Sequence, residues 1–295
     1  SMELALENRN EIKKRLQTEQ RQLMIKKFFG NKLAVIGGTV TLIMVLLAVF
    51  APVICPQGPL DMAVAQRLQP PSLEGYLFGS DTYGRDVFTR VLYGARVSLT
   101  IGASVSIISM LLGMMIGLLA SYYRALDNIL MRICGGLSAI PSTLLAIALM
   151  AMMGSGTTNL IISLTVVSTP RLARIARSAA LVVREQTYVE AMRATGASSM
   201  RIIWRHIAPN ILSPVVVQAS YIFANSIITE AALSFLGVGV PIPDPSWGNI
   251  LNEGKAVIYK AWWMIVYPGI FTALTVLGLN VFGDGLRDVL DPHTN

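Results

Sequence analysis

The sequence contains little charge and little cysteine. Of its 295 residues only 14% are charged, whereas roughly 25% are charged in a soluble globular protein. Its two cysteines, Cys55 and Cys134, are too few for a disulfide scaffold. Because 53% of the residues are apolar, an intrinsically disordered chain is excluded. The scarcity of charge also argues against an ordinary water-soluble enzyme.

Motifs of several catalytic and metal-binding classes are missing as well. The nearest approach to a nucleotide-binding P-loop runs from Gly248 to Gly254-Lys255 and has five intervening residues where the motif needs four. There is no His-Glu-x-x-His and no Gly-x-Ser-x-Gly. His206 and His293 stand alone, so we expect no metal site within this chain. The sequence therefore predicts a chain that is not itself an enzyme.

The apolar residues are gathered into long runs, and these runs determine the fold class. A helix needs about 20 mostly apolar residues to cross roughly 30 Å of hydrocarbon, because it rises 1.5 Å per residue. Six runs predict an all-α, polytopic membrane protein with six transmembrane helices. The expected helices cover residues 33–54, 97–123, 129–153, a run that starts near 158, 211–236 and 263–282.

The fourth run is the shortest of the six. It ends at Thr169-Pro170, and Arg171, Arg174 and Arg177 follow. We interpret it as a short span whose helix continues into the cytoplasm, with its arginines reaching the lipid headgroups. If this run did not cross the membrane, the last third of the chain would lie on the opposite side.

Lysine and arginine are distributed unevenly along the chain. With the N-terminus placed inside, about three quarters of the 24 basic residues fall in cytoplasmic segments, as the positive-inside rule requires. This predicts that both termini are cytoplasmic and that residues 1–32 form a basic cytoplasmic segment. Residues 55–96 and 237–262 are then extracytoplasmic loops. Since this asymmetry accounts for much of the net charge of +7, we expect no nucleic-acid partner.

The two outer loops contain charged and aromatic residues at their membrane ends. We expect Arg85, Asp86 and Arg90 to organise an outer amphipathic helix, with contact to a binding protein as the alternative. The pair Trp262-Trp263 fits an aromatic belt at the membrane interface.

A cytoplasmic segment at residues 182–210 is larger than a connection between two membrane helices needs to be. It contains two short helical patterns separated by Gly196, where glycine permits a positive φ. Pro209 ends the second pattern or opens the next span. The segment predicts a compact, partly apolar helical elbow, which we call the elbow. We interpret it as a docking element for a soluble partner.

The elbow resembles the signature loop of the permeases in binding-protein-dependent ABC importers. That family carries Glu-Ala-Ala, three residues and Gly, followed by a spacer that ends in a proline-containing stretch. Here Glu190-Ala191-Met192 precedes Gly196, and Pro209 stands at the family's spacing.

Two further stretches resemble the C-type permease of the dipeptide, oligopeptide and nickel branch. One is Phe-Gly-Ser-Asp-Thr-Tyr-Gly-Arg-Asp at residues 78–86, and the other begins Gly-Asp-Gly-Leu-Arg-Asp at 283–288 and extends to 292. The resemblance covers nearly the whole chain, from about residue 25 to 292. It implies the type I permease fold of ABC importers for residues 97–292, in the inner (plasma) membrane of a bacterium.

The function implied by the resemblance is that of a transmembrane permease subunit. Such a subunit forms half of the translocation pathway for peptides or peptide-like solutes and couples it to cytoplasmic ATPases. Import of nickel or another metal chelate by the same machinery is an open alternative. A self-contained ion-coupled carrier is a second alternative.

The implied partners are a second homologous permease subunit in a heterodimer, two cytoplasmic ATPase subunits, an extracytoplasmic solute-binding protein and the lipid bilayer. ATP and Mg are used by the ATPases, so this chain is expected to bind no cofactor. The ATPase-coupling surface would belong to the elbow. Its residues would be Glu190, Ala191, Ala194, Gly196, Ala197, Met200, Ile203, Trp204 and Pro209.

Glu230 is the only acidic residue well inside an expected span. Ionisable residues in membrane-spanning helices are rare and mark functional sites by default. At 1.5 Å per residue it lies roughly 29 Å along the fifth span, near the outer mouth. There it would make a structural hydrogen bond at the helix end or line the solute pathway with Asn225 and Ser226. An ion-coupled carrier would need several such residues, which argues against that alternative.

Overall fold

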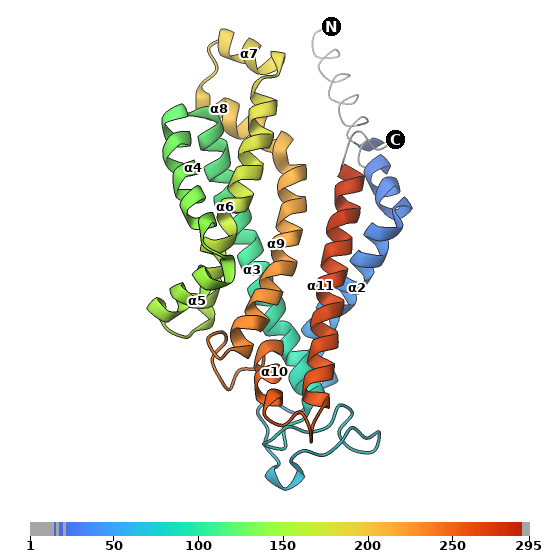
Figure 1. The fold of residues 1–295 in the computed structure, drawn as a ribbon. Coiled ribbons are helices and arrows are strands. Elements are labelled where there is room, and N and C mark those ends of the chain that lie inside the picture. The colour runs from blue at the N-terminus through green and yellow to red at the C-terminus, as the bar shows by residue number, and fades with distance from the viewer. Residues whose placement is uncertain (1–14, 16–17, 20–21, 291–295) are drawn as a thin grey trace.

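The computed structural model describes residues 15, 18, 19 and 22–290 as an elongated bundle of helices (Figure 1). The described residues form no strand, which confirms the all-α prediction. The long helices are α2 (Lys32–Ile54), α3 (Val87–Tyr122), α4 (Arg124–Ala139), α5 (Ser142–Met153), α6 (Thr157–Arg184), α9 (Leu212–Phe235) and α11 (Trp263–Leu290). The shorter elements are η1 (Val64–Gln66), α7 (Thr187–Ala194), α8 (Ser199–Ile202), η2 (Ile203–Ile207), η3 (Ala208–Ile211) and α10 (Trp247–Lys255).

The expected basic segment at residues 1–32 lies largely outside the described residues. Residues 22–30 are helical, and α2 follows after Asn31. The side chain of Asn31 accepts a hydrogen bond from the backbone N–H of Ala34 at 3.1 Å. This N-cap satisfies one of the donors that the first turn of a helix leaves free, and so defines where α2 begins.

Four helices are long and apolar enough to cross a membrane. They are α2, α3, the helical run 199–235 that ends with α9, and α11. A fifth crossing is obtained if α4 and α5, which are bent by 95° relative to each other, are taken as one broken span. Helix α6 is not among them because Arg171, Arg174 and Arg177 follow its apolar first half. The structure therefore supports four or five of the six expected crossings.

The break between α4 and α5 divides the run that the sequence predicts as one helix over 129–153. Ile140 and Pro141 both have extended backbone at this point, with ψ of 133° and 131°. Proline disfavours a helical residue before it, and its ring cannot be accommodated inside a continuous helix. The expected third span is for this reason a bent pair of helices.

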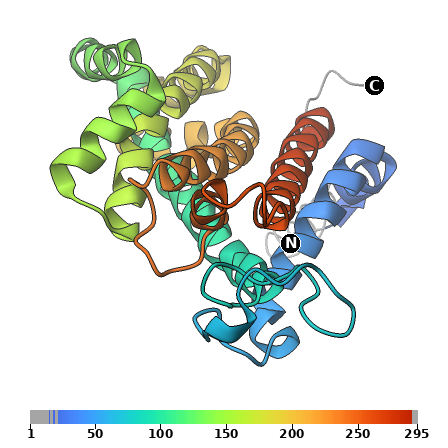
Figure 2. The ribbon, with the colours of Figure 1, turned by 60° about the horizontal axis from the view of Figure 1, so that its bottom comes forward.

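The elbow lies at the end of the bundle where α2 begins and α11 ends (Figure 1). At this end Asn31 Nδ2 donates to Asp288 Oδ2 at 3.4 Å, which joins α2 to α11. The segment between α2 and α3 and the segment that contains α10 lie at the opposite end, as Figure 2 also shows. The elbow and these outer segments are thus separated by the full length of the long helices.

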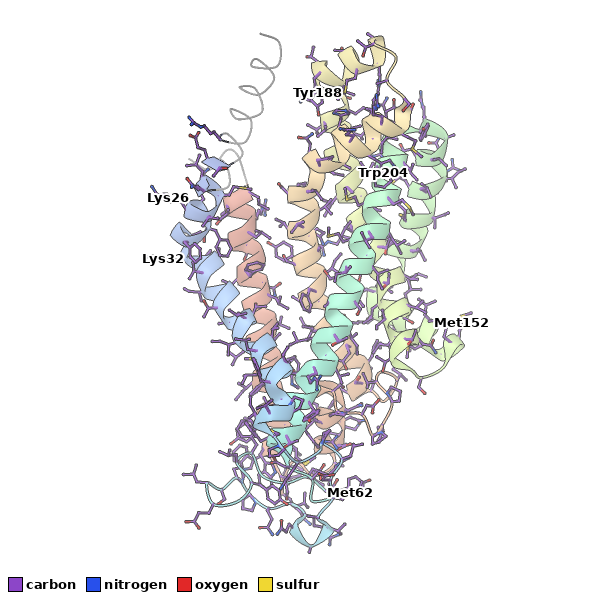
Figure 3. All side chains as sticks on the ribbon, turned by 180° about the vertical axis from the view of Figure 1, so that it is seen from behind. Lys26, Lys32, Met62, Met152, Tyr188 and Trp204 are labelled. Carbon is purple, nitrogen blue, oxygen red and sulfur yellow. The ribbon has the colours of Figure 1, made fainter. Side chains whose placement is uncertain are left out.

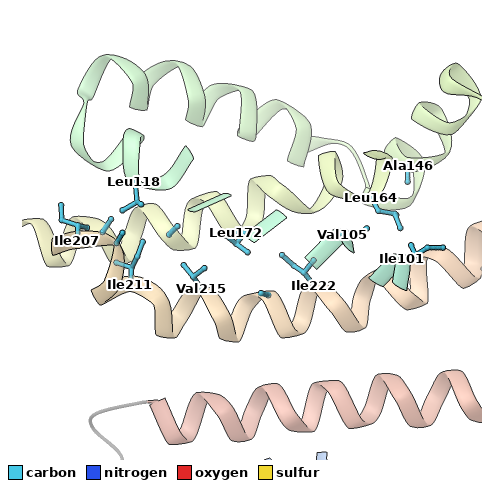
Figure 4. Packing of buried hydrophobic residues seen from close by; sticks show 14 of the residues in the cluster. Ile101, Val105, Leu118, Ala146, Leu164, Leu172, Ile207, Ile211, Val215 and Ile222 are labelled. Carbon is cyan, nitrogen blue, oxygen red and sulfur yellow. The ribbon is translucent and has the colours of Figure 1, made fainter. Parts of the chain in front are cut away.

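Helices α3, α6 and α9 form the core of the bundle. Many of their buried apolar side chains belong to one cluster that extends along the helix axes (Figure 4). Members of this cluster include Ile101, Val105, Leu164, Leu172, Val215 and Ile222. Burial of such side chains, together with close packing, holds helices together where the lipid itself is apolar.

Small residues allow the backbones of α3 and α6 to approach closely. A Cβ atom placed on Gly117 would lie 2.6 Å from the Cβ of Ala176 and 2.7 Å from the carbonyl oxygen of Ala173. One turn earlier, a Cβ on Gly113 would lie 2.6 Å from the side chain of Leu172. The Gly-x-x-x-Gly motif at 113–117 therefore serves packing within the chain. It also places α6 alongside α3, which is long and apolar enough to cross the membrane.

Helix α3 begins at Val87, ten residues before the expected start of the second span at 97. Its N-cap is Asp86, whose side chain accepts from the backbone N–H groups of Phe88 and Thr89. The expected outer loop 55–96 therefore ends at residue 86. Helix α11 also extends further than expected, to Leu290.

Charged residues near the start of α3 are buried, contrary to the expected amphipathic outer helix. Arg85 Nε lies 2.5 Å from Asp81 Oδ2, and Arg85 Nη2 lies 2.7 Å from Glu253 Oε2 of α10. Arg90 is also fully buried and approaches Glu253 at 3.2 Å. Opposite charges allow these side chains to be buried together, and they connect the outer segment before α3 to α10.

The tryptophans of the outer loop do not all face the membrane interface. Trp262 is 50% exposed, but Trp263 is buried and its Nε1 donates to the carbonyl of Ser80 at 3.0 Å. Trp247 is fully buried, and its Nε1 donates to the carbonyl of Val91 at 3.0 Å. These two indoles fasten the outer loop to the bundle, so only Trp262 fits the expected interfacial belt.

We expect the replacement of Gly117 by alanine to lower the free energy of unfolding by about 1–3 kcal/mol, because the added methyl group meets backbone atoms of α6 that cannot yield. Gly135→Ala in α4 is a matched control, since nothing lies within 4 Å of a Cβ there. The control should be neutral or stabilising by up to about 1 kcal/mol. Equilibrium unfolding in mixed detergent micelles measures both. Equal stability of the two variants would contradict the close contact between α3 and α6.

Candidate functional site

Two regions contain the candidate functional residues: the elbow and a groove between α6 and α9. In the elbow, α7 and α8 meet at Gly196, which has a φ of +81°. The N–H of Ala197 donates to the carbonyl of Met192, and the N–H of Gly196 donates to that of Arg193, both at 3.0 Å. This is the hydrogen-bond pattern of a Schellman cap. Since a Cβ at Gly196 would meet nothing within 4 Å, the glycine is needed for its backbone conformation and not for packing.

Buried apolar side chains fix the elbow to the bundle. Val189, Ile202, Ile203 and Ile207 are fully buried and belong to the same cluster as Leu118 of α3. Ile203, which is expected on the ATPase-coupling surface, thus has no exposed surface in this chain. Its place in the π-helical turn η2 directs it toward the bundle, where it holds the elbow in position.

Polar contacts add to this attachment. Arg184, at the end of α6, donates from Nη1 to the carbonyl of Ser121 at 2.5 Å. The guanidinium group of Arg193 lies 5.1 Å from the centre of the Tyr122 ring, within the range of a cation–π interaction. Both contacts join the elbow region to the inner end of α3, so the elbow and the bundle are connected on more than one side.

The other expected coupling residues are largely accessible. Exposed are Glu190, Ala191, Ala194, Gly196, Met200, Trp204 and Pro209, and Ala197 is half-buried. Met200 is 55% exposed and Trp204 is 47% exposed, although both are large and apolar. Figure 3 shows Trp204 and Tyr188 at this end of the molecule. Exposed apolar side chains beside polar ones are typical of a surface that binds another protein.

Glu230 lies near the end of α9 that leads toward α10 and is fully buried. Its carboxylate accepts hydrogen bonds from Ser98 Oγ and Ser234 Oγ, each at 2.8 Å. Ser98 Oγ in turn accepts from the N–H of Trp247, and Ser234 Oγ accepts from the N–H of Val240. Glu230 is therefore the centre of a network that joins α3, α9 and the loop containing α10.

Asn225 and Ser226 lie apart from this network. Both line a cavity of approximately 240 Å³ between α6 and α9, and Glu230 is not among its lining residues. The lining consists of Ser142, Leu164, Val167, Ser168, Arg171, Gln218, Ile222, Asn225, Ser226 and Thr229. We call this cavity the groove. The structure thus brings together two of the three candidate pathway residues and separates the third from them.

The arginines of α6 do not share one environment. Arg177 forms an ion pair with Asp127 of α4, with Nε 2.5 Å from Oδ1. Arg174 donates from Nη2 to the carbonyl of Cys134 at 3.0 Å. Arg171 faces the groove instead. Arg174 and Arg177 thus have partners on α4 within the bundle, whereas Arg171 lines the groove.

Sequence reasoning did not identify Arg171 and Gln218 as part of a polar groove. A signal was present, because the polar residues Gln218, Asn225, Ser226 and Thr229 recur at helical spacing along one side of α9. That Arg171 lines the same groove as these residues follows only from the packing of α6 against α9.

The family described as "Binding-protein-dependent transport system inner membrane component" matches residues 109–295. The "N-terminal TM domain of oligopeptide transport permease C" matches residues 19–71. Together these two matches include most of the chain, and the first covers the whole elbow and the groove.

Individual relatives agree with this result. A putative peptide transport system permease protein of Brucella suis biovar 1 is 49% identical over 273 residues, which are 92% of this chain and 90% of the relative. The dipeptide transport system permease protein DppC of Alkalihalophilus pseudofirmus is 41% identical over 90% of this chain and 88% of its own length. The glutathione transport system permease protein GsiD of Pectobacterium atrosepticum is 40% identical over 90% of this chain and 89% of its own length.

A solved structure of the MetNI methionine ABC transporter in inward-facing conformations has the same fold. It superimposes with a TM-score of 0.58 at 21% identity, over 68% of this chain and 97% of that chain. With the fold, the exposed elbow and these matches in agreement, the chain belongs to the inner membrane permeases of binding-protein-dependent ABC importers, in the C-type branch that includes the peptide permeases.

Proposed function

We propose that this chain is one of two membrane subunits of an ATP-driven importer for peptides and forms half of the translocation pathway. The observation that carries the proposal is the elbow, whose outer surface is exposed while its inner side is continuous with the core of the bundle. The relatives named for peptide, dipeptide and glutathione transport favour peptides or peptide-like solutes over nickel as the cargo.

The partners follow from the same proposal. A second homologous permease completes the pathway in a heterodimer, and an extracytoplasmic binding protein delivers the solute. Two cytoplasmic ATPase subunits bind the elbows and use ATP and Mg. Exposed apolar side chains on the elbow, such as Met200 and Trp204, support a protein partner at this end.

Six membrane crossings are part of the proposal, with both termini and the elbow in the cytoplasm. Helix α6 is the sixth crossing in this proposal, although its arginines make it less apolar than the other spans. Close contacts of Gly113 and Gly117 of α3 with Leu172, Ala173 and Ala176 support a position of α6 alongside α3. Helices α4 and α5 would return the chain from the end of α3 to the start of α6. Each long helix then connects opposite sides of the bilayer.

Coupling would work through the packing of the elbow. When the ATPases move, they displace α7 and α8, and the buried residues Ile202 and Ile207 transmit this movement to the helices of the core. Since α6 enters the elbow and α9 leaves it, the two helices that line the groove are the ones attached directly to the moving element. A rigid element attached at both ends is suited to switch between two states.

Glu230 has a different role in this proposal. Its carboxylate is occupied by two serine hydroxyls and is separated from the groove. It acts as a structural acceptor that holds the outer loop on α3 and α9. Of the three candidate pathway residues, Asn225 and Ser226 keep that role, because both line the groove.

The first test concerns Gly196. We expect Gly196→Val to lower ATP-dependent peptide uptake at least tenfold in proteoliposomes that contain the complete importer, because valine strongly disfavours a φ of +81° and the elbow would be distorted. Gly154→Val is the matched control, since Gly154 has a φ of +84° and open space around its Cβ but lies at the outer turn before α6. Normal uptake in Gly196→Val would count against the elbow as the coupling element.

The second test concerns the exposed apolar surface. We expect Trp204→Ala to weaken the binding of the ATPase subunits to the permease pair about tenfold or more, since exposed aromatic side chains are often the main anchors of an interface. Trp262→Ala is the control, because Trp262 is similarly exposed but lies in the outer loop. Binding of labelled ATPase subunits to permeases in nanodiscs measures the difference. An ATPase affinity lowered equally by both variants, or by neither, would argue against docking at Trp204.

The third test concerns Glu230. We expect Glu230→Gln to keep uptake within about twofold, because the amide oxygen can still accept from a serine hydroxyl. Glu230→Ala should lower the free energy of unfolding by about 1–3 kcal/mol, since it leaves buried hydroxyl groups without a partner. Uptake and detergent unfolding are measured on the same preparations. Loss of uptake in Glu230→Gln at unchanged stability would contradict the structural role and indicate that Glu230 takes part in translocation.

A further inference from the structure

The groove between α6 and α9 has an unusual composition for a cavity at membrane depth. Its lining contains one cation, Arg171, and several neutral side chains that can donate hydrogen bonds, but neither aspartate nor glutamate. Such a lining is complementary to an anion with several acceptor atoms.

Arg171 lies near the middle of the 28-residue helix α6, roughly 20 Å from either end at 1.5 Å per residue. Its neighbour Leu172 packs against Gly113 of α3, a helix apolar enough to cross a membrane, so the proposed six-crossing arrangement puts Arg171 at membrane depth. A charged residue at this depth costs several kcal/mol unless it is compensated. Within the part of the chain that the structure describes, Arg171 has neither an ion-pair partner nor a hydrogen-bond partner.

Two other residues of the groove also have unused hydrogen-bonding capacity. The Oγ of Ser226 and the Nε2 of Gln218 are buried and have no hydrogen-bond partner among the described residues. Both residues are more than nine-tenths buried and both line the groove. Leaving a buried polar group unpaired costs about 1–3 kcal/mol, so two such groups beside an uncompensated cation indicate that something else completes the site.

We propose that the groove is a transient binding site for the carboxylate group of the transported peptide, with Arg171 as the cation and Gln218 and Ser226 as additional donors. This rests on the proposed function, which makes the cargo a peptide. A carboxylate has two oxygens that accept from a guanidinium group in a bidentate manner and still accept from a hydroxyl and an amide.

The geometry also explains how such a site would release its ligand. Arg171 and Asn225 are exposed on one side of the groove, so the cavity opens at the surface of this chain. One cation with neutral donors attracts an anion without enclosing it. Conduction requires a site favourable enough to enter and weak enough to leave. Movement of α6 relative to α9 would separate Arg171 from Ser226 and disassemble the site.

The test uses the complete importer in proteoliposomes with its binding protein, and a mixture of radiolabelled alanine dipeptide and tripeptide as the probe. Uptake per ATP hydrolysed is compared for the wild type and for Arg171→Lys, Arg171→Gln and Arg171→Glu. Arg174→Gln is the matched control, since Arg174 lies one turn away on α6 and bonds to α4. Ser226→Ala tests the contribution of the neutral donor.

We expect Arg171→Gln to lower uptake per ATP at least tenfold and Arg171→Glu at least a hundredfold, because the latter repels a carboxylate. Arg171→Lys should fall between the wild type and Arg171→Gln, because lysine keeps the charge but cannot bind a carboxylate in a bidentate manner. Ser226→Ala should lose three- to fivefold, and Arg174→Gln should remain within twofold. ATP hydrolysis stimulated by the binding protein should stay within twofold of the wild type in every variant. This pattern would support a site for the cargo.

Two outcomes would overturn the inference. Unchanged uptake per ATP in Arg171→Gln would show that no carboxylate depends on this cation. If ATP hydrolysis or assembly fell in parallel with uptake, Arg171 would be pairing with an acid of the second permease or serving the gate. Failure of the proposed function would look different, since the wild-type complex itself would then show no ATP-dependent uptake.

Discussion

The continuous apolar cluster that runs from the core helices into the elbow is the interaction on which the rest of this structure depends. Leu164 and Leu172 of α6, Val215 of α9 and Ile202 and Ile207 of the elbow belong to one packed unit. In a bilayer there is no hydrophobic force between helices, so close packing must hold them, and glycine and alanine between α3 and α6 make that packing possible. Because the elbow is part of the same packed unit, a force applied to its surface reaches the helices that line the groove. In the proposed mechanism, coupling therefore depends on the packing of the core.

The outer end of the molecule is held together by different means. Here Glu230 collects hydrogen bonds from two serines, and the pairs formed by Arg85 and Arg90 with Asp81 and Glu253 are buried between α3 and α10. Indole N–H groups of Trp247 and Trp263 complete the attachment of the loop. Directional contacts of this kind give a defined arrangement but break when one partner moves. The end that contains α10 is therefore held by a dense network of polar contacts in addition to its apolar packing, whereas the elbow is held mainly by apolar packing, with the contacts of Arg184 and Arg193 beside it.

The sequence predicts the helical class, most helix positions and the elbow correctly because these depend on local patterns. The apolar run of α2 and the glycine at residue 196 are examples. The sequence does not predict the start of α3 at Val87. Charged residues such as Arg90 indicate an exposed loop in the sequence, but Arg90 is buried in the structure. The run at 129–153, predicted as one helix, is a pair of helices bent by 95° at Pro141. Hydropathy alone also fails to identify α6 as a membrane span, because its arginines lower the mean hydropathy although the helix packs against α3.

Composition and periodicity were sufficient to predict the helical fold class and the position of the elbow in the chain, because both depend on local patterns. The family was indicated by a resemblance whose motifs lie at 78–86, 190–209 and 283–292. Which residues share a site was decided only by the tertiary structure. Asn225 and Glu230 are five positions apart on α9, yet one lines the groove and the other is buried in the outer network. Arg171 and Ser226 are far apart in sequence but line the same cavity. The reason is physical: the face of a helix that a residue occupies can be read from the sequence, but the neighbour that covers this face depends on how distant helices pack.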